Sequence, residues 1–258
     1  MESGAGREAL AGPPPRTKLL VYSCPTAHRA FVAALERAFE ALETGIDLVL
    51  YARSDRDSIG HLLMGNADLA IISSALSESE RSHGLTERVI AHQIVVPIVH
   101  ASNRIQSIPE GDFQRLIQGQ LSNWQRLGGI DLDVQPVCKH RPRINDAADQ
   151  ALRVKSKAED RTVFLATPRE ILAYVSNHPR SCGLVSLTHF QGVRGVRGLE
   201  INHVSATRKN FERGAWPVGA TIRSVSPHDP SVDARALLDY LKSESARNVI
   251  GLKLTLPN

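Results

Sequence analysis

The sequence predicts an α/β protein in which mostly parallel sheets are covered by helices on both faces. Short apolar runs at residues 18–22, 46–51 and 68–72 have the length and composition of buried strands. Segments with apolar residues at helical spacing lie between these runs, and residues 28–42 form the longest of them. Strands that alternate with helices in this way are typical of βαβ units and a parallel sheet.

The connection after the second strand is expected to be polar. Residues 53–58 alternate in charge, which is typical of a solvated loop, although Ser54 or Ser58 remains available there as a hydroxyl donor. A short helix is expected at 59–64, and Gly65 is expected to end it. The third strand, 68–72, then leads into Ser73 and Ser74.

The rest of the chain continues the same pattern. The β-branched run 89–99 predicts a central or crossover strand, with an edge or bend at Pro97. Thr167 and Pro168 form a typical helix start, because Thr caps the N-terminus and Pro suits the first helical position. The other expected elements are a helix from 112 ended by Gly119, strands at 132–137 and 182–187, an extended stretch at 216–222, helices at 146–151, 230–241 and 243–250, and a tail strand at 252–256.

Composition limits the kind of ligand that the chain is expected to bind. The chain has 258 residues, of which 42% are hydrophobic and 22% charged, so a packed core is expected. Its 31 basic and 27 acidic residues give a net charge of +4. This mild excess is compatible with an anionic ligand or with simple solubility, and it is too small to indicate nucleic-acid binding.

Three cysteines, Cys24, Cys138 and Cys182, are too far apart in sequence for a metal motif. A disulfide between two of them and three small buried thiols are both compatible with the sequence. No apolar run is long enough to span a membrane. Residues 1–16 are expected to be a disordered lead without the features of a signal peptide, so either the protein is cytoplasmic or its export signal is missing from this chain.

Residues 112–129 (DFQRLIQGQLSNWQRLGG) are the most distinctive segment. After the helix ended by Gly119, Asn123 and Trp124 lead to a turn at Gly128 and Gly129. The segment resembles the pattern F-x-G-x-x-x-N-W-x-x-x-G-G of the substrate-binding proteins of bacterial phosphate ABC transporters (PstS-like), in the type II periplasmic binding protein superfamily. Similar matches follow one another over residues 17–256, among them GNADLA at 65–70, LSESE at 76–80, TPREILAYVSNHPRSCG at 167–183 and WPV at 216–218.

The resemblance implies a two-lobed fold in which each lobe is a mostly parallel sheet flanked by helices, and two crossover strands join the lobes. Lobe one is expected at 17–96 plus 188–258, and lobe two at 97–187. The resemblance also implies that a ligand lies between the lobes and that hinge motion closes them. A small inorganic anion, phosphate or one similar to sulfate, an ABC permease as partner, a monomeric state and an extracytoplasmic location are the corresponding expectations.

An oxyanion in such a site is held by backbone N–H groups at helix N-termini and by short hydroxyl side chains. Carried over by position, the resemblance gives a predicted set of six ligand-binding residues. Thr26 falls on a family binding threonine, and Lys139 falls on the family's basic position. The full predicted set is Thr26, Ser73, Ser74, Lys139, Arg143 and Asn145.

The chain departs from the family at loop 53–58, where the family carries a Gly- and Ser-rich turn, and also at two of the loops that contain predicted site residues. Ser73 stands where phosphate binders often carry an acidic residue that accepts the proton of monohydrogen phosphate, so the site is expected to lack one reason to prefer phosphate over sulfate. Arg143, Ile144 and Asn145 replace the family's Ser-Gly-Thr, and the loss of glycine there hinders close backbone approach to an anion. Lys139, Arg141 and Arg143 are available to supply charge instead, and a basic loop that is simply exposed is equally compatible with these residues.

Two functions are therefore compatible with the sequence. The first is non-catalytic binding of a small oxyanion, for an ABC transporter or as a sensor. The second is a binding-protein-like domain whose ligand site has degenerated and which serves protein contacts. An enzyme is not expected, and neither is a cofactor, because no nucleophile-elbow, zinc-protease, P-loop or dinucleotide motif is present.

Overall fold

The computed structural model describes residues 17–23, 29–42, 44–117, 120–139 and 161–257. Its strands are β1 (Thr17–Ser23), β2 (Ile46–Ala52), β3 (Leu69–Ile72), β4 (Leu85–His100), β5 (Ser107–Ile108), β6 (Gln135–Lys139), β7 (Val163–Leu165), β8 (Ser181–Ser186), β9 (Val196–Gly198), β10 (Glu200–Ile201) and β11 (Gly219–Pro227). Its helices are α1 (Arg29–Glu40), α2 (Asp55–Leu63), α3 (Glu78–Ser82), α4 (Glu110–Ile117), α6 (Pro168–Asn177), α7 (Leu187–Phe190), α8 (Arg208–Glu212), α9 (Val232–Tyr240) and α10 (Glu244–Gly251), with a 3-10 helix η1 (Trp124–Leu127).

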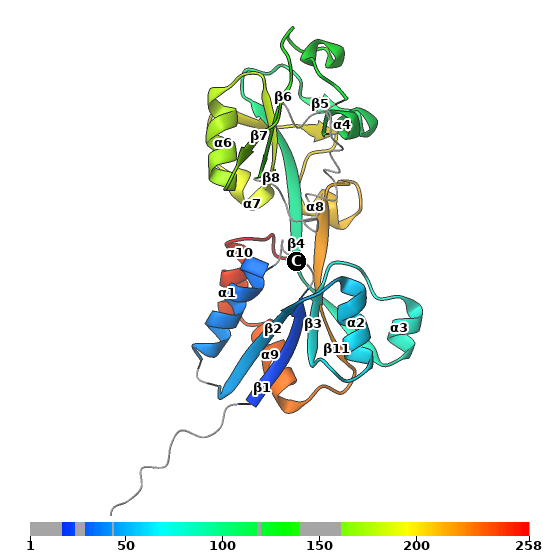
Figure 1. Cartoon of the computed structure of the whole chain (residues 1–258). Helices are drawn as coiled ribbons and strands as arrows, with labels where there is room; N and C mark the ends of the chain where they lie inside the picture. The colour runs from blue at the N-terminus through cyan, green and yellow to red at the C-terminus, as the bar shows by residue number, and fades with distance from the viewer. Residues whose placement is uncertain (1–16, 24–28, 43, 118–119, 140–160, 258) are drawn as a thin grey trace, which may run out of the picture.

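One mixed sheet runs through the molecule in the order β2-β1-β3-β11-β4-β8-β6-β7, and β9 also pairs with β4. Strand β1 is parallel to β2 and β3, and β6 is parallel to β7 and β8. The long strands β4 and β11 are antiparallel to each other and connect two separate masses of the molecule (Figure 1). The predicted α/β class with two crossover strands is confirmed.

The lower mass in Figure 1 is built on β1, β2 and β3, with helices on both faces of the sheet. Leu19 and Val21 of β1 pack with α1, α9 and α10 on one face. Tyr22 of β1 packs on the other face with Ile59 and Leu62 of α2. Because both faces are covered, successive residues of these strands are apolar rather than alternating with polar ones. We call the buried residues of this mass the first core.

The upper mass has its own core, which includes buried residues from Ile94 to Val218 and which we call the second core. Trp124 and Trp216 are among its largest fully buried side chains. The expected division placed residues 188–258 together in lobe one, but Leu199 and Trp216 pack in the second core. This part of the division is corrected, because the chain returns to the first core only along β11.

Helix α2 corrects the prediction for residues 53–64. The helix begins at Asp55, where a solvated loop was predicted. Ser54 is the N-cap, and its side-chain oxygen accepts a hydrogen bond from the Asp57 N–H at 3.1 Å. Asp55 and Asp57 place negative charge in the first turn, where the helix dipole favours it. The alternating charges therefore belong to a capped helix start, and Ser58 is buried inside it.

The segment recognised at 112–129 forms the expected helix and turn. Phe113 and Leu116 are the buried residues of α4. The Asn123 side chain caps η1 by accepting from the Gln125 N–H at 2.8 Å, and Gly128 ends it in the left-handed region with φ 79°. Trp124 is fully buried, and its Nε1 donates to the Arg180 carbonyl at 2.9 Å. Gly119 lies outside the described residues.

The sequence predictions for α6, β4 and the C-terminal tail had different outcomes. Thr167 caps α6 as predicted, because its hydroxyl accepts from the Glu170 N–H at 3.2 Å and Pro168 is the first helical residue. Pro97, predicted at an edge or bend, lies instead inside the central strand β4, where it is opposite Leu184. The expected tail strand is reduced to an isolated bridge between Thr255 and His92.

Cys138 and Cys182, the two cysteines within the described ranges, do not form a disulfide, and burial raises the pKa of the Cys182 thiol. Cys24 and the helix expected at 146–151 lie outside the described residues. In the described part of the chain, no helix has both the length and the apolar character needed to cross a membrane.

Candidate anion-binding site

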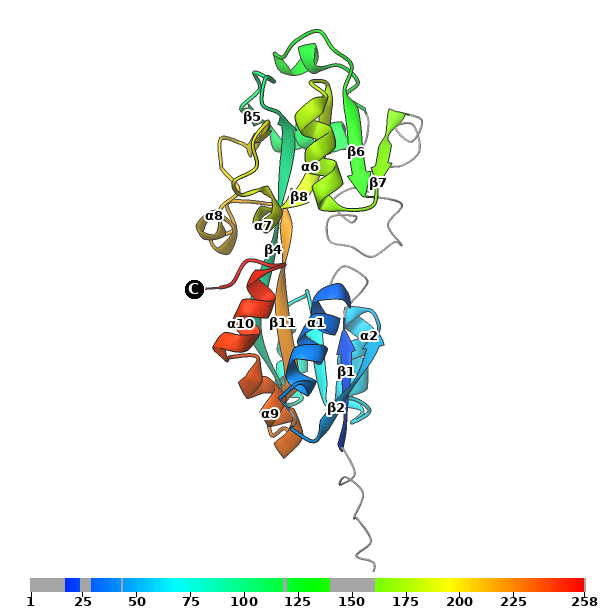
Figure 2. The same ribbon diagram turned by 90° about the vertical axis from the view of Figure 1, so that its left-hand side faces the viewer.

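The carboxyl ends of the parallel strands of both cores are directed toward the region between the two cores, which we call the waist (Figure 2). Strand β1 ends there at Ser23, and Ser73 follows directly after β3. Strand β6 approaches from the second core and ends at Lys139. Ligands of open α/β sheets bind beyond the carboxyl ends of the strands, so these ends locate the candidate site.

Three of the six predicted site residues can be placed. Ser73 is half-buried, Ser74 is exposed, and Lys139 is exposed at the end of β6. Thr26, Arg143 and Asn145 lie outside the described residues, and their ligand contacts stay predictions. The structure therefore brings Ser73 and Ser74 together in one turn of the first core and places Lys139 on the second core.

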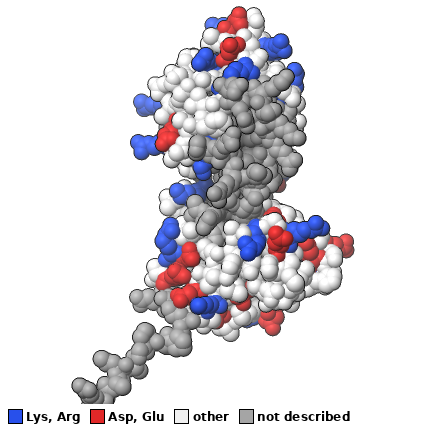
Figure 3. Space-filling view, in the orientation of Figure 1, with Lys and Arg blue, Asp and Glu red and all other residues white. Residues whose placement is uncertain are grey.

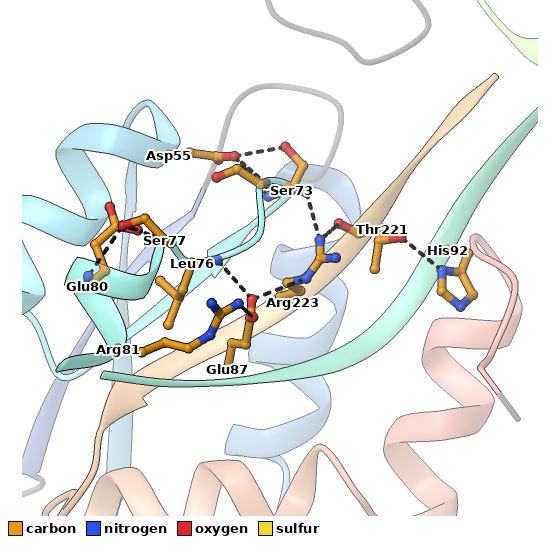
Figure 4. Close-up of polar contacts among 11 residues, drawn as sticks. Asp55, Ser73, Leu76, Ser77, Glu80, Arg81, Glu87, His92, Thr221 and Arg223 are labelled. Atoms are coloured by element: carbon orange, nitrogen blue, oxygen red, sulfur yellow. Dashed lines mark hydrogen bonds and ion pairs between the residues drawn. The ribbon is translucent and has the colours of Figure 1, made fainter. Parts of the chain in front are cut away.

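The Ser73–Ser74 turn binds a carboxylate of the same chain. Asp55 Oδ2 accepts hydrogen bonds from the Ser73 N–H at 3.1 Å, from the Ser73 hydroxyl at 3.0 Å and from the Ser74 N–H at 2.7 Å. Figure 4 shows the Asp55 carboxylate and the Ser73 side chain pointing toward each other at this edge of the first core. Three donors that converge on one oxygen stabilise the ionised carboxylate.

Asp55 is the site residue that the sequence analysis missed. It is only 18 positions from Ser73, and it reaches the turn because α2 begins one residue after its cap Ser54. A Ser with acidic residues one and three positions later, here Asp55 and Asp57, is a helix-start signal, and that signal was available in the sequence. The expectation that this turn lacks an acidic group is therefore corrected, since Asp55 supplies the carboxylate that residue 73 does not.

Arg223 of β11 binds the same turn from the other side. Its Nη1 donates to the Ser73 carbonyl at 2.9 Å and to the Thr221 carbonyl at 3.2 Å. Its Nε lies 3.2 Å from Glu87 Oε2, and the Leu76 N–H donates to the same Glu87 oxygen at 3.1 Å. Asp55 thus holds Ser73 through its N–H and hydroxyl, and Arg223 holds it through its carbonyl (Figure 4).

Glu87 is the counter-charge for two arginines. Arg81 Nη2 lies 2.6 Å from Glu87 Oε1, opposite the contact that Arg223 makes with Oε2. Burial alone would raise the pKa of Glu87, but the hydrogen bonds from Arg81 and from the Leu76 N–H, with the charges of both arginines, hold its pKa below the ordinary value. The carboxylate is therefore a stable anionic partner for Arg223 near neutral pH.

The edge of the second core is basic. Burial, followed by the charges of Lys253 and Lys139, lowers the pKa of His189 in α7. The His189 Nδ1 lies 2.6 Å from the Ser186 hydroxyl. The positive charges of Lys253 and Lys139 therefore act on the His189 ring in α7.

The described surface carries charges of both signs. Figure 3 shows Lys and Arg interspersed with Asp and Glu on the exposed parts of this face that are not grey. Over the described ranges, no group of three or more His, Cys, Asp or Glu side chains is arranged to hold a metal ion. The chemistry available at the waist is therefore that of hydroxyls, backbone amides, Asp55 and basic side chains.

Comparison with known proteins agrees with this architecture. The sequence pattern of the PBP superfamily domain matches residues 10–245, which is most of the chain. The chain belongs to the PBP superfamily. This PBP-superfamily chain is also 25% identical over 206 residues to the phosphate-binding protein PstS of Bacillus subtilis (strain 168), a match that covers 75% of this chain and 63% of that relative.

Solved structures share the fold of this PBP-superfamily chain. A PstS structure from Borrelia burgdorferi aligns with a TM-score of 0.74 at 16% identity, covering 94% of this chain and 100% of that one. An ABC-type phosphate transport receptor from Vibrio cholerae aligns with a TM-score of 0.73 at 18% identity, covering 92% of this chain and 100% of that one. These likenesses confirm the two-lobed fold.

Proposed function

We propose that this protein binds a small oxyanion, phosphate or a similar anion, in a cleft between the two cores, without catalysing a reaction. It serves as the solute-binding component of an ABC transporter. The observation that carries this proposal is the convergence of strand carboxyl ends from both cores at the waist, with Ser73 on one side and Lys139 on the other. The similarity to proteins named as phosphate-binding supports the choice of anion.

The described groups suit an anion that carries a proton. Lys139 supplies positive charge, and the Ser73 hydroxyl is a short polar group at the edge of the site. The Asp55 carboxylate is acceptor-only, so it repels a fully ionised anion but accepts a hydrogen bond from a protonated one. Monohydrogen phosphate brings such a proton and sulfate does not. We therefore propose that Asp55 makes the site prefer phosphate.

A second function has one specific observation in its favour. The Ser73 and Ser74 donors are already used by Asp55, so the turn is satisfied without any ligand. This arrangement also suits a binding-protein-like domain that has lost its ligand and serves protein contacts. The two functions differ in whether any oxyanion binds to the folded protein.

Calorimetric titration of the purified chain with phosphate, sulfate and arsenate tests the proposal. The expected result is phosphate binding in about the micromolar range or tighter, which corresponds to roughly −8 kcal/mol. Arsenate, which also carries a proton, is expected to follow phosphate, and sulfate is expected to bind more weakly. Flat titrations for all three anions, with circular dichroism showing folded protein, would reject oxyanion binding and favour the second function.

A further inference from the structure

Arg223 lies where the anion-binding turn meets a strand that connects the two cores. In the β11–β3 pair, Arg223 is opposite Ile72, the last residue of β3 before the turn. The pairing register between β11 and β4 shifts between Ile222 and Arg223, which marks a bulge or irregularity in the crossover pair. The Arg223 side chain is 18% exposed, so most of it is packed against protein.

The guanidinium group links the turn to this irregularity. One nitrogen, Nη1, donates to the Ser73 carbonyl in the turn and to the Thr221 carbonyl in β11. These two carbonyls belong to segments about 150 residues apart in sequence, and the same group joins them. Arginine suits this position because its planar group presents several donors in a fixed geometry.

The contacts continue from Thr221 toward the second core. The Thr221 hydroxyl lies 3.3 Å from His92 Nδ1 on β4, and His92 Nε2 lies 3.3 Å from Glu212 Oε1 on α8. Phe211, the neighbour of Glu212 in α8, packs against the second core. A series of polar contacts therefore runs from Ser73 through both crossover strands to an element of the second core (Figure 4 shows it as far as His92).

We propose that Arg223 is a positioning residue that fixes the Ser73–Ser74 turn for the anion and couples this turn to the crossover strands. The proposal rests on the oxyanion-binding function proposed above. A ligand that pulls on the turn moves the Ser73 carbonyl, and Arg223 carries that movement to Thr221, which lies beside the register shift of the β4–β11 pair. Hinge closure absorbs its backbone changes at a few residues, and an irregular crossover pair is suited to this role.

Arg81 provides a matched control. It shares the same counter-ion, because it binds Glu87 as Arg223 does. Its side chain binds Glu87, whereas the Ser73 and Thr221 carbonyls accept from Arg223. Arg81→Gln therefore removes one positive charge beside Glu87 and leaves the turn bound, whereas Arg223→Gln removes the charge together with both carbonyl contacts.

The test compares Arg223→Gln, Arg223→Lys and Arg81→Gln in the full chain. Hydrogen exchange without ligand is measured at the Ser73 and Ser74 amides, phosphate affinity by calorimetry, and closure by the decrease of the radius of gyration at saturating phosphate. In Arg223→Gln we expect exchange at these amides to be about tenfold faster, affinity to fall about tenfold and closure to be reduced. Arg223→Lys is expected to recover part of the amide protection, the phosphate affinity and the closure. Arg81→Gln is expected to resemble the wild type in all three.

Different results contradict the two proposals. If the wild type binds no anion, the proposed function fails, while the exchange rates still decide whether Arg223 fixes the turn. Wild-type exchange in folded Arg223→Gln overturns the positioning role. Weaker affinity with full closure at saturation overturns the coupling, because a merely structural role lowers stability without changing the closed state. Equal effects in Arg81→Gln assign the result to the shared charge and also overturn the proposal.

Discussion

The segment at 112–129 and the turn at Ser73–Ser74 are built in opposite ways. In the first, Trp124 is fully buried and its indole donates to a backbone carbonyl of another segment, so the segment is part of the packed second core. In the second, polar groups of Asp55 and Arg223 meet at an edge of the first core. The first region gives the chain its family resemblance, whereas the second contains the groups that we propose distinguish one anion from another.

This difference predicts that substitutions in the two regions affect different properties of the protein. Changes in the polar turn are expected to alter anion affinity with little effect on stability. Changes in the buried segment are expected to alter stability with little effect on affinity. A variant that changed both quantities in parallel would contradict the comparison.

The largest expected effect follows from Asp55→Asn. The amide keeps an oxygen for the Ser73 and Ser74 donors but loses the negative charge that accepts the phosphate proton. Phosphate affinity is expected to fall by about 10- to 100-fold, the range for a hydrogen bond to a charged group, and sulfate affinity is expected to rise. Competition calorimetry with the two anions measures the ratio. Asp57→Asn, in the same helical turn, is the control and should leave the ratio unchanged.

Gly129→Ala tests the buried segment. A Cβ at this position would lie 2.9 Å from Ile105 Cδ1 and 3.0 Å from the Trp124 carbonyl oxygen, so backbone and side chains must shift. The expected loss of stability is about 1–3 kcal/mol, measured by urea denaturation, with phosphate affinity unchanged in the folded protein. Gly111→Ala on α4 meets no atom within 4 Å and should not destabilise. A Gly129→Ala protein of wild-type stability would show that the segment is loosely packed.

The smallest expected effect concerns His92, which lies on the crossover strand β4. Burial, which outweighs the opposing Glu212 interaction, lowers the pKa of His92 from its ordinary 6.5. As the pH falls, the unfolded chain therefore protonates this histidine before the folded chain does. The contribution of neutral His92 to the free energy of unfolding is present above pH 6.5 and is lost as the pH falls through the lower folded-state pKa. Urea denaturation at a series of pH values should show a smaller decrease for His92→Gln than for the wild type. The exposed His83→Gln is the control, and equal slopes for all three would contradict this role of His92.

Sequence reasoning predicted the features that depend on neighbouring residues. Thr167 was predicted to cap α6, and its hydroxyl accepts from an N–H three residues away, so its role is readable from local spacing. Ser54 was readable in the same way, but the alternating charges of 53–58 were interpreted as a loop, and the start of α2 was therefore missed. That error also concealed Asp55, whose position in the first turn decides where its carboxylate lies.

Contacts between distant segments could not be predicted from one sequence. The Arg223 contact with Ser73 joins positions 150 residues apart and depends on the register of β11 against β3. The boundary expected at residue 188 was wrong for a similar reason, since Trp216 belongs to the second core through its hydrogen bond to Val95. Such placements are decided by packing of the whole sheet rather than by local propensity.

A crystal structure of the protein grown with phosphate tests the central claim most directly. We expect an anion between the two cores, with one oxygen at hydrogen-bond distance from the Asp55 carboxylate and Lys139 of the second core drawn toward it. Phosphate binding in solution, combined with a crystal structure in which the anion lies away from Asp55 and the Ser73–Ser74 turn, would contradict it.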